Sequence, residues 1–317
     1  MSAELAASSG QPASSGQPAS SGQPASSGQP ASSGQPARAD LHCHSTASDG
    51  TRPPAEVIRR AAAAGLDLIA LTDHDTVAGL AQARQALPPG MALLPGMELS
   101  CRRDGHSVHL LGYLFDPDHG ALKAELQAIR DSRVDRARAM VTRLAELGAP
   151  VTWDQVAAIA GAGVVGRPHV ARALLATGVV SSVAEAFSTD WIGPGGRAHV
   201  ARYALDPVHA VALVREAGGV TVLAHPLAQT RGALVSDRLI TELARAGLAG
   251  LEIAHPDHDQ AQRERLRTLA SSLGLIATGG SDDHGELTGD RIGCERTAPD
   301  QLDRLLAGGS GAAVMTG

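Results

Sequence analysis

Two pairs of ligand-type residues share an alternate-residue spacing. His42 and His44 lie two residues apart in ADLHCH, and Asp282 and His284 repeat the spacing in GGSDDH. Residues two apart on an extended strand project to the same face, so each pair can direct its side chains at one point. This is a typical arrangement of metal ligands on a strand, although an isolated pair also fits two structural histidines.

The same residue types recur after other apolar runs of the sequence. Glu98 has two carboxylate oxygens that could bridge two metal ions, and Asp73 or Asp75 could orient the His74 imidazole. We interpret all these residues as one centre of imidazole and carboxylate ligands, which suits Zn, Mn or Fe. With the two pairs above, the set is completed by Asp49, His74, Glu98, His109 and His225.

The other histidines and the cysteines have weaker sequence context. We expect His106, His119, His169, His199, His209 and His255 to be surface or structural residues. Cys43, Cys101 and Cys294 show no CxxC spacing, which fits a reducing compartment and three small packing residues. The sequence therefore predicts a metal centre without cysteine ligands.

The candidate ligands end short apolar runs, and helix-like stretches such as residues 56–65 separate most of these runs. This order predicts an α/β domain in which parallel βα units close into a barrel. Such barrels place chemistry at the C-terminal ends of the strands, where most of the ligand candidates would lie. The expected strands are residues 39–44, 68–75, 92–98, 107–113, 219–226, 248–255 and 275–284.

The segment from about residue 120 to 202 has a different character. Residues 121–147 are helix-like, and GAGVVGRPH and WIGPGGRAH follow them. We expect a helical insertion in the barrel domain, where it could shape access to the barrel mouth.

Composition sets the domain limits. Residues 1–37 are expected to be a disordered tail, because ASSGQP repeated five times offers no core-forming side chain. Residues 38–317 suit one large domain. A net charge of -6 and an aromatic content of 2% argue against a long nucleic-acid track. No apolar stretch fits a signal peptide or a membrane span, so a soluble cytoplasmic protein is expected.

The motifs HCHS, TDHD, GMELS, VHLLGY, AHP and GSDDH, in that order, resemble the PHP family, named for polymerase and histidinol phosphatase. The resemblance covers nearly everything after Arg38 and implies a distorted (β/α)7 barrel that holds two or three divalent ions. It also implies three ligand sets: His42, His44, Glu98 and Asp282; Glu98, His109 and His225; Asp49, His74 and His284.

The insertion with GRPHVARAL looks like that of stand-alone members that act on 3',5'-bisphosphate nucleotides or on the 5' end of short RNA. The resemblance implies hydrolysis of a phosphate ester by a metal-bound hydroxide, with Glu98 and Asp282 as catalytic residues. Arg167 would bind a phosphate through its guanidinium fork, and His258 is a weaker candidate for the scissile phosphate. Two departures concern the substrate: Asp283 stands where relatives often carry an aromatic residue, and LAQTRG is less basic than usual.

Three alternatives stay open to different degrees. An amidohydrolase would often bridge its metals with a carboxylated lysine, but the only lysine is Lys123 in ALKAEL, away from any expected strand end. Histidinol phosphate or another small phosphomonoester is a possible substrate that the GRPH insertion disfavours. A non-catalytic metal-binding module would keep the same ligands.

Overall fold

The structure, a computed structural model, describes residues 37–201, 203–228 and 234–317. The ASSGQP repeat and most of LAQTRG lie outside the described residues. Among the described residues, no helix combines the length and the apolar character that crossing a bilayer requires.

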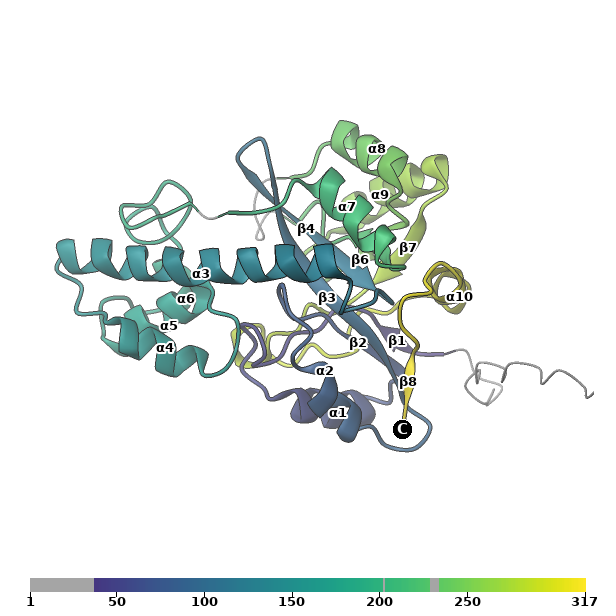
Figure 1. Cartoon of the computed structure of the whole chain (residues 1–317), viewed down its shortest axis with the longest axis horizontal. Coiled ribbons are helices and arrows are strands. Elements are labelled where there is room, and N and C mark those ends of the chain that lie inside the picture. Colours follow the sequence, from purple (N-terminus) through teal and green to yellow (C-terminus); the bar gives the residue numbers. More distant parts are fainter. Residues whose placement is uncertain (1–36, 202, 229–233) are drawn as a thin grey trace, which may run out of the picture. The chain divides into compact units, whose positions relative to one another are not determined.

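Seven strands follow one another around a nearly closed barrel in chain order (Figure 1). Beyond the assigned ends of the first and last strands, the amide of Asp282 donates to the carbonyl of His42 at 2.8 Å and the amide of His44 to that of Asp283 at 2.9 Å. These bonds join the two edges, and the predicted seven-stranded α/β barrel is confirmed. The strands are β1 (Ala39–Asp40), β2 (Leu68–Leu71), β3 (Ala92–Arg103), β4 (His106–Tyr113), β5 (Val220–Leu223), β6 (Gly250–Ala254) and β7 (Ile276–Gly279); β8 (Met315–Thr316) pairs with β3.

The expectation of an all-parallel barrel is wrong at β4, which runs antiparallel to both β3 and β5. Only Asp104 and Gly105 separate β3 from β4, and two residues allow a hairpin but no crossover helix. Both have positive φ, 49° and 81°, as a tight hairpin turn requires. The first strand is also shorter than expected, since β1 ends at Asp40 and His42 and His44 follow it.

Strand alternation buries both faces of the barrel wall. Leu68 and Ala70 join a cluster contributed by six of the seven barrel strands, which is the barrel interior, while Ile69 and Leu71 pack in the cluster with α1. The helices of the barrel are α1 (Pro54–Ala63), α2 (Leu80–Gln85), α7 (Pro207–Glu216), α8 (Asp237–Ala246), α9 (Gln260–Leu273), α10 (Pro299–Ala307) and the 3-10 turn η2 (Gly285–Leu287). The helix predicted over residues 56–65 is α1, and it ends before Gly65, whose φ is 71°.

The segment between β4 and α7 contains helices. Its long first helix packs through Leu126 and Ile129 in a cluster with residues of β3, β4 and α7, outside the barrel interior, and then enters a separate core through Met140 and Leu144. Figure 1 shows this helix extending from the strands, with the shorter helices of the segment beside its far half. The helices are α3 (Gly120–Glu146), α4 (Trp153–Ala160), α5 (Arg167–Ala176) and α6 (Val183–Ala186).

A stability prediction concerns Tyr113, which is fully buried and donates its hydroxyl to the carbonyl of Leu41 at 2.7 Å. The change Tyr113→Phe leaves that buried carbonyl without its donor, so the free energy of unfolding should fall by about 1–3 kcal/mol. Urea unfolding measures this value. Tyr203→Phe is the matched control, since Tyr203 is 46% exposed and its change should stay within about 0.5 kcal/mol. Equal losses in both variants would contradict the prediction.

Candidate metal centre

Five imidazoles surround the carboxylate of Glu98, which is 1% exposed. Its Oε1 lies 2.8 Å from Nδ1 of His109 and 3.1 Å from Nε2 of His225. Its Oε2 lies 3.1 to 3.3 Å from one nitrogen of each of three more rings: His42, His44 and His74. The sequence indicated that Glu98 ends its strand, but the residue lies within β3, where a β-bridge pairs it with His74.

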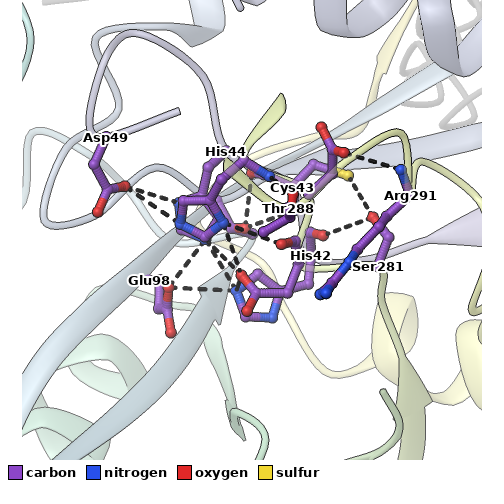
Figure 2. A network of polar contacts seen from close by, with 12 residues as sticks. His42, Cys43, His44, Asp49, Glu98, Ser281, Thr288 and Arg291 are labelled. Atoms are coloured by element: carbon purple, nitrogen blue, oxygen red, sulfur yellow. Dashed lines mark hydrogen bonds and ion pairs between the residues drawn. The ribbon is translucent and has the colours of Figure 1, made fainter. Parts of the chain in front are cut away.

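Two aspartates complete the group. Oδ1 of Asp282 lies 3.4 Å from Nε2 of His42 and 3.3 Å from Nε2 of His44. The carboxylate of Asp49 lies 3.4 Å from Nε2 of His284 and 3.7 Å from Nε2 of His74. Figure 2 shows the side chains of His42, His44, Asp49 and Glu98 close together, with Glu98 coming from a different segment than the other three. The structure therefore brings all nine predicted ligand residues together.

The donor atoms fall into three groups, each with all its atoms within 4.8 Å of one another. The groups are His42, His44, Glu98, Asp282; His44, Asp49, His74, His284; and His74, Glu98, His109. The first group is identical to one expected ligand set, and the second adds His44 to the expected set of Asp49, His74 and His284. The third group contains His74 where the expected set has His225, although His225 also lies beside the Glu98 oxygen that faces His109.

Several imidazole nitrogens of this cluster are buried without a hydrogen bond. Within the described part of the chain, Nδ1 of His44, His74 and His109 has no hydrogen-bond partner, although two of these atoms lie within 3.2 Å of Glu98. Buried polar atoms normally have partners, and nitrogen and oxygen donors converging without hydrogen-bond geometry fit a shared cation. The donor set thus fits divalent ions.

The cluster also sets its own protonation. Burial alone would raise the pKa of Glu98, but the neighbouring His74, His109 and His42 hold it well below its usual range. Burial lowers the pKa of His74 to about 3 and that of His225 to about 4. Burial would also lower the pKa of His44, but hydrogen bonds with Asp282 and Glu98 raise it to about 10. His74 and His225 are therefore neutral at pH 7, the form that binds metal.

The backbone is strained at the ends of three strands around the cluster. Asp75, His225 and Asp282 have φ values of 55°, 29° and 49°, in a region that residues with a Cβ rarely adopt. Such positions persist where the surrounding structure holds them, and they gather at functional sites.

The aspartates beside His74 hold the surrounding segments. Asp73 accepts hydrogen bonds from the amide of Ser45 at 2.8 Å and the hydroxyl of Ser48 at 2.7 Å, which fixes the loop before Asp49. Asp75 accepts from the guanidinium of Arg133 at 2.5 Å. Arg133 is a buried residue of α3 that the sequence analysis missed, because one arginine among many in a long helix carries no distinguishing pattern.

Two further buried residues were not selected from the sequence as part of the site. Glu252 of β6 lies 3.0 Å from Nδ1 of His42, and the His255 ring, expected to be structural or at the surface, lies 3.4 Å from Asp282. Both belong to LEIAH, which ends a predicted strand in the same way as the other ligand motifs, and that position was the available signal.

The predicted substrate contacts have different surroundings. Arg167 begins α5, and its guanidinium lies 5.3 Å from the centre of the Phe187 ring. Burial, together with Arg133, lowers the pKa of Arg167, and no hydrogen bond or ion pair is found for it within the described ranges. His258 is buried with both ring nitrogens on the backbone: Nδ1 donates to the Ile253 carbonyl at 3.0 Å, and Nε2 accepts from the Leu227 amide at 3.2 Å.

The remaining sequence expectations have clear outcomes. Lys123 is exposed in α3 and pairs with Asp118 at 2.8 Å, as expected for a lysine away from the site. The carboxylate of Asp283 is buried and accepts hydrogen bonds from the amides of Gly285 and Arg291, so it shapes its own loop. Cys43 and Cys101 are buried, but the expectation that Cys294 is a small packing residue is wrong, since it is exposed.

Comparisons with known proteins agree with this geometry. The PHP domain family matches residues 40–155. A 5'-3' exoribonuclease of Haemophilus influenzae is 37% identical over 246 residues, 77% of this chain and 89% of the relative. A 3',5'-nucleoside bisphosphate phosphatase of Chromobacterium violaceum is 37% identical over 254 residues, 80% and 89% of the two chains.

A solved structure supports the same assignment at the level of the fold. A Bifidobacterium adolescentis protein assigned as a metal-dependent phosphoesterase superposes with a TM-score of 0.81 at 34% identity, covering 87% of this chain and 98% of its own. The motifs, the barrel and these likenesses together show that this chain belongs to the PHP family.

Proposed function

We propose that this protein hydrolyses phosphate esters with divalent metal ions held by the nine converging residues. The observation that carries the proposal is Glu98, whose two oxygens each face a different group of imidazoles: His109 and His225 on one side, the remaining three on the other. A carboxylate placed in this way is suited to bridge two ions. Zn, Mn and Fe all accept such imidazole and carboxylate ligands.

The chain's residues supply the parts that this reaction needs. When bound, the ions would lower the pKa of a water molecule and neutralise charge on the phosphate. Glu98 and Asp282 would hold them in place, since both face the imidazoles of His42 and His44. We assign no role at the reacting phosphate to His258, because both of its ring nitrogens are already engaged by the backbone.

We further propose a nucleotide substrate with two phosphates, or the 5' end of a short RNA. Arg167 offers a partly buried guanidinium that lines the same surface region as Arg133 and Arg136. The loop before α5 lies beside the metal cluster, since the amide of Val164 donates to the Ala47 carbonyl at 2.9 Å in the loop that carries Asp49. A phosphate on Arg167 would place the substrate while another phosphate reacts. The two relatives above, a 5'-3' exoribonuclease and a 3',5'-nucleoside bisphosphate phosphatase, fit this substrate class.

The first prediction from the proposed function concerns Glu98→Ala. Removing a ligand shared by the proposed ions should reduce the bound metal and lower kcat/KM for phosphate release at least about 100-fold. Elemental analysis and a phosphate assay on the same preparation measure both quantities. Glu146→Ala, an exposed change in α3, is the control. Full activity in the Glu98 variant would refute the metal assignment.

The second prediction concerns Arg167→Ala. Loss of a charged hydrogen bond is worth about 1.5–3 kcal/mol, so kcat/KM for a 3',5'-bisphosphate nucleotide should fall about 10- to 100-fold. An aryl phosphate, which has no second phosphate, should be affected much less. Arg138→Ala is the matched control, because its guanidinium also stacks on an aromatic ring, that of Trp153. Equal loss on both substrates would remove Arg167 from the substrate site.

A panel of substrates tests the activity as a whole. Wild-type protein loaded with Mn²⁺ or Zn²⁺ should release phosphate fastest from bisphosphate nucleotides or degrade short 5'-phosphorylated RNA. Preference for histidinol phosphate would overturn the nucleotide assignment, while bound metal without turnover on any substrate would identify a metal-binding module.

A further inference from the structure

β6 lies between β5 and β7, and predicted metal ligands follow both of these strands. None of the nine predicted ligand residues follows β6. Two of its ligand-type side chains are nevertheless completely buried against that cluster: Glu252 within the strand and His255 directly after it. Charged and imidazole groups are rarely buried without a specific partner, so their contacts define what they do.

Glu252 joins two ligand segments through its two oxygens. Oε1 lies 3.0 Å from Nδ1 of His42, and Oε2 accepts the backbone amide of His225 at 2.8 Å. A proton on Nδ1 of His42 leaves the lone pair on Nε2, the nitrogen that faces Glu98 and Asp282. The amide contact holds the backbone of His225, whose φ of 29° needs such support.

His255 has the complementary arrangement. Its Nδ1 accepts the backbone amide of Asp257 at 3.0 Å, so its proton lies on Nε2. That nitrogen is 3.4 Å from Oδ2 of Asp282, while Oδ1 of the same carboxylate faces His42 and His44. The contact fixes the rotation of Asp282, whose φ is also positive at 49°.

We propose that Glu252 and His255 are positioning residues of the metal centre: β6 contributes no ligand but orients ligands from the segments after β1, β5 and β7. The inference rests on the proposed function, because it assigns these two residues to the metals proposed there. Hydrogen-bonded partners of metal ligands typically change metal affinity 10- to 100-fold when they are removed.

Glu252→Gln tests the first residue with almost no change in volume. A carboxylate accepts at both oxygens, whereas an amide accepts at one and donates at the other. The Gln NH₂ group must therefore face either the His225 amide or Nδ1 of His42, where it would place the His42 proton on Nε2. In both cases the affinity for Mn²⁺ and for Zn²⁺ should fall about 10- to 100-fold.

His255→Asn and His255→Gln form a matched pair for the second residue. The Gln amide can place its NH₂ near the position of the imidazole Nε2, whereas the Asn amide reaches only as far as Nδ1. Asn should therefore weaken metal binding about 10-fold, and Gln should restore most of it. This pair also keeps the proposal testable if the Glu252 variant does not fold.

The measurement is calorimetric titration of chelator-stripped, full-length protein with Mn²⁺ alone and with Zn²⁺ alone, alongside thermal unfolding of the stripped protein. Ile253→Ala is the structural control, because Ile253 is the neighbour of Glu252 but packs with the outer helices. It should lower the unfolding temperature and leave metal affinity unchanged.

The outcomes separate the two proposals. A wild-type protein that binds neither ion would overturn the proposed function itself, and the positioning role with it. Wild-type binding that survives unchanged in Glu252→Gln and His255→Asn would overturn the positioning role alone. Equal weakening in Ile253→Ala would do the same, since it would show a general effect of disturbing β6.

Discussion

The structure depends on a carboxylate buried among imidazoles. An ionised carboxylate that is buried as deeply as Glu98 loses most of its hydration. The free-energy cost of this desolvation is offset only if polar partners surround the carboxylate closely. Glu98 obtains them from five histidines that come from four separate segments of the chain. The chain must therefore bring the ends of β1, β2 and β5 and the middle of β4 to one place, which is what the barrel does.

The antiparallel hairpin is part of this solution. Glu98 pairs with Leu111 and Ser100 pairs with His109, so Glu98 and His109 are diagonal neighbours on one face of the hairpin. A parallel crossover between these strands would separate the two segments by a helix. The departure from a regular βα barrel thus places a bridging carboxylate and one of its imidazoles next to each other within a single local unit.

The helical segment is tied to the same strands. Arg133 of α3 reaches both the carboxylate of Asp75 and the hydroxyl of Ser100, which follow His74 by one residue and Glu98 by two. The same guanidinium lines the pocket that contains Arg167. Arg133 therefore lies next to both the proposed phosphate contact and the proposed ion site.

How far the sequence could predict this site depended on the range of the interactions. Alternate spacing and strand-end position identified the cluster because both are local properties of the chain. Asp104-Gly105 is a strong local turn signal for the hairpin, but the alternation of helix-like and apolar segments elsewhere in the chain favours parallel strands. Arg133 could not be selected in this way, because its role comes from a contact with a residue 58 positions away, which no local pattern records. Glu252 shares the strand-end position of the ligands, but its contact with His42, 210 positions away, is visible only in the fold.

Charge balance connects the proposed metal ligands with the proposed positioning residue Glu252. Four buried carboxylates touch its imidazoles: Asp49, Glu98, Glu252 and Asp282. If they are ionised and the ligand imidazoles neutral, their four negative charges equal the positive charge of two divalent ions. A third ion would leave an excess of two positive charges in a region of low dielectric, where a phosphate dianion supplies the matching charge. In this proposal Glu252, which belongs to none of the three donor groups, would affect both how the ligands are oriented and how strongly the loaded site attracts an anionic substrate.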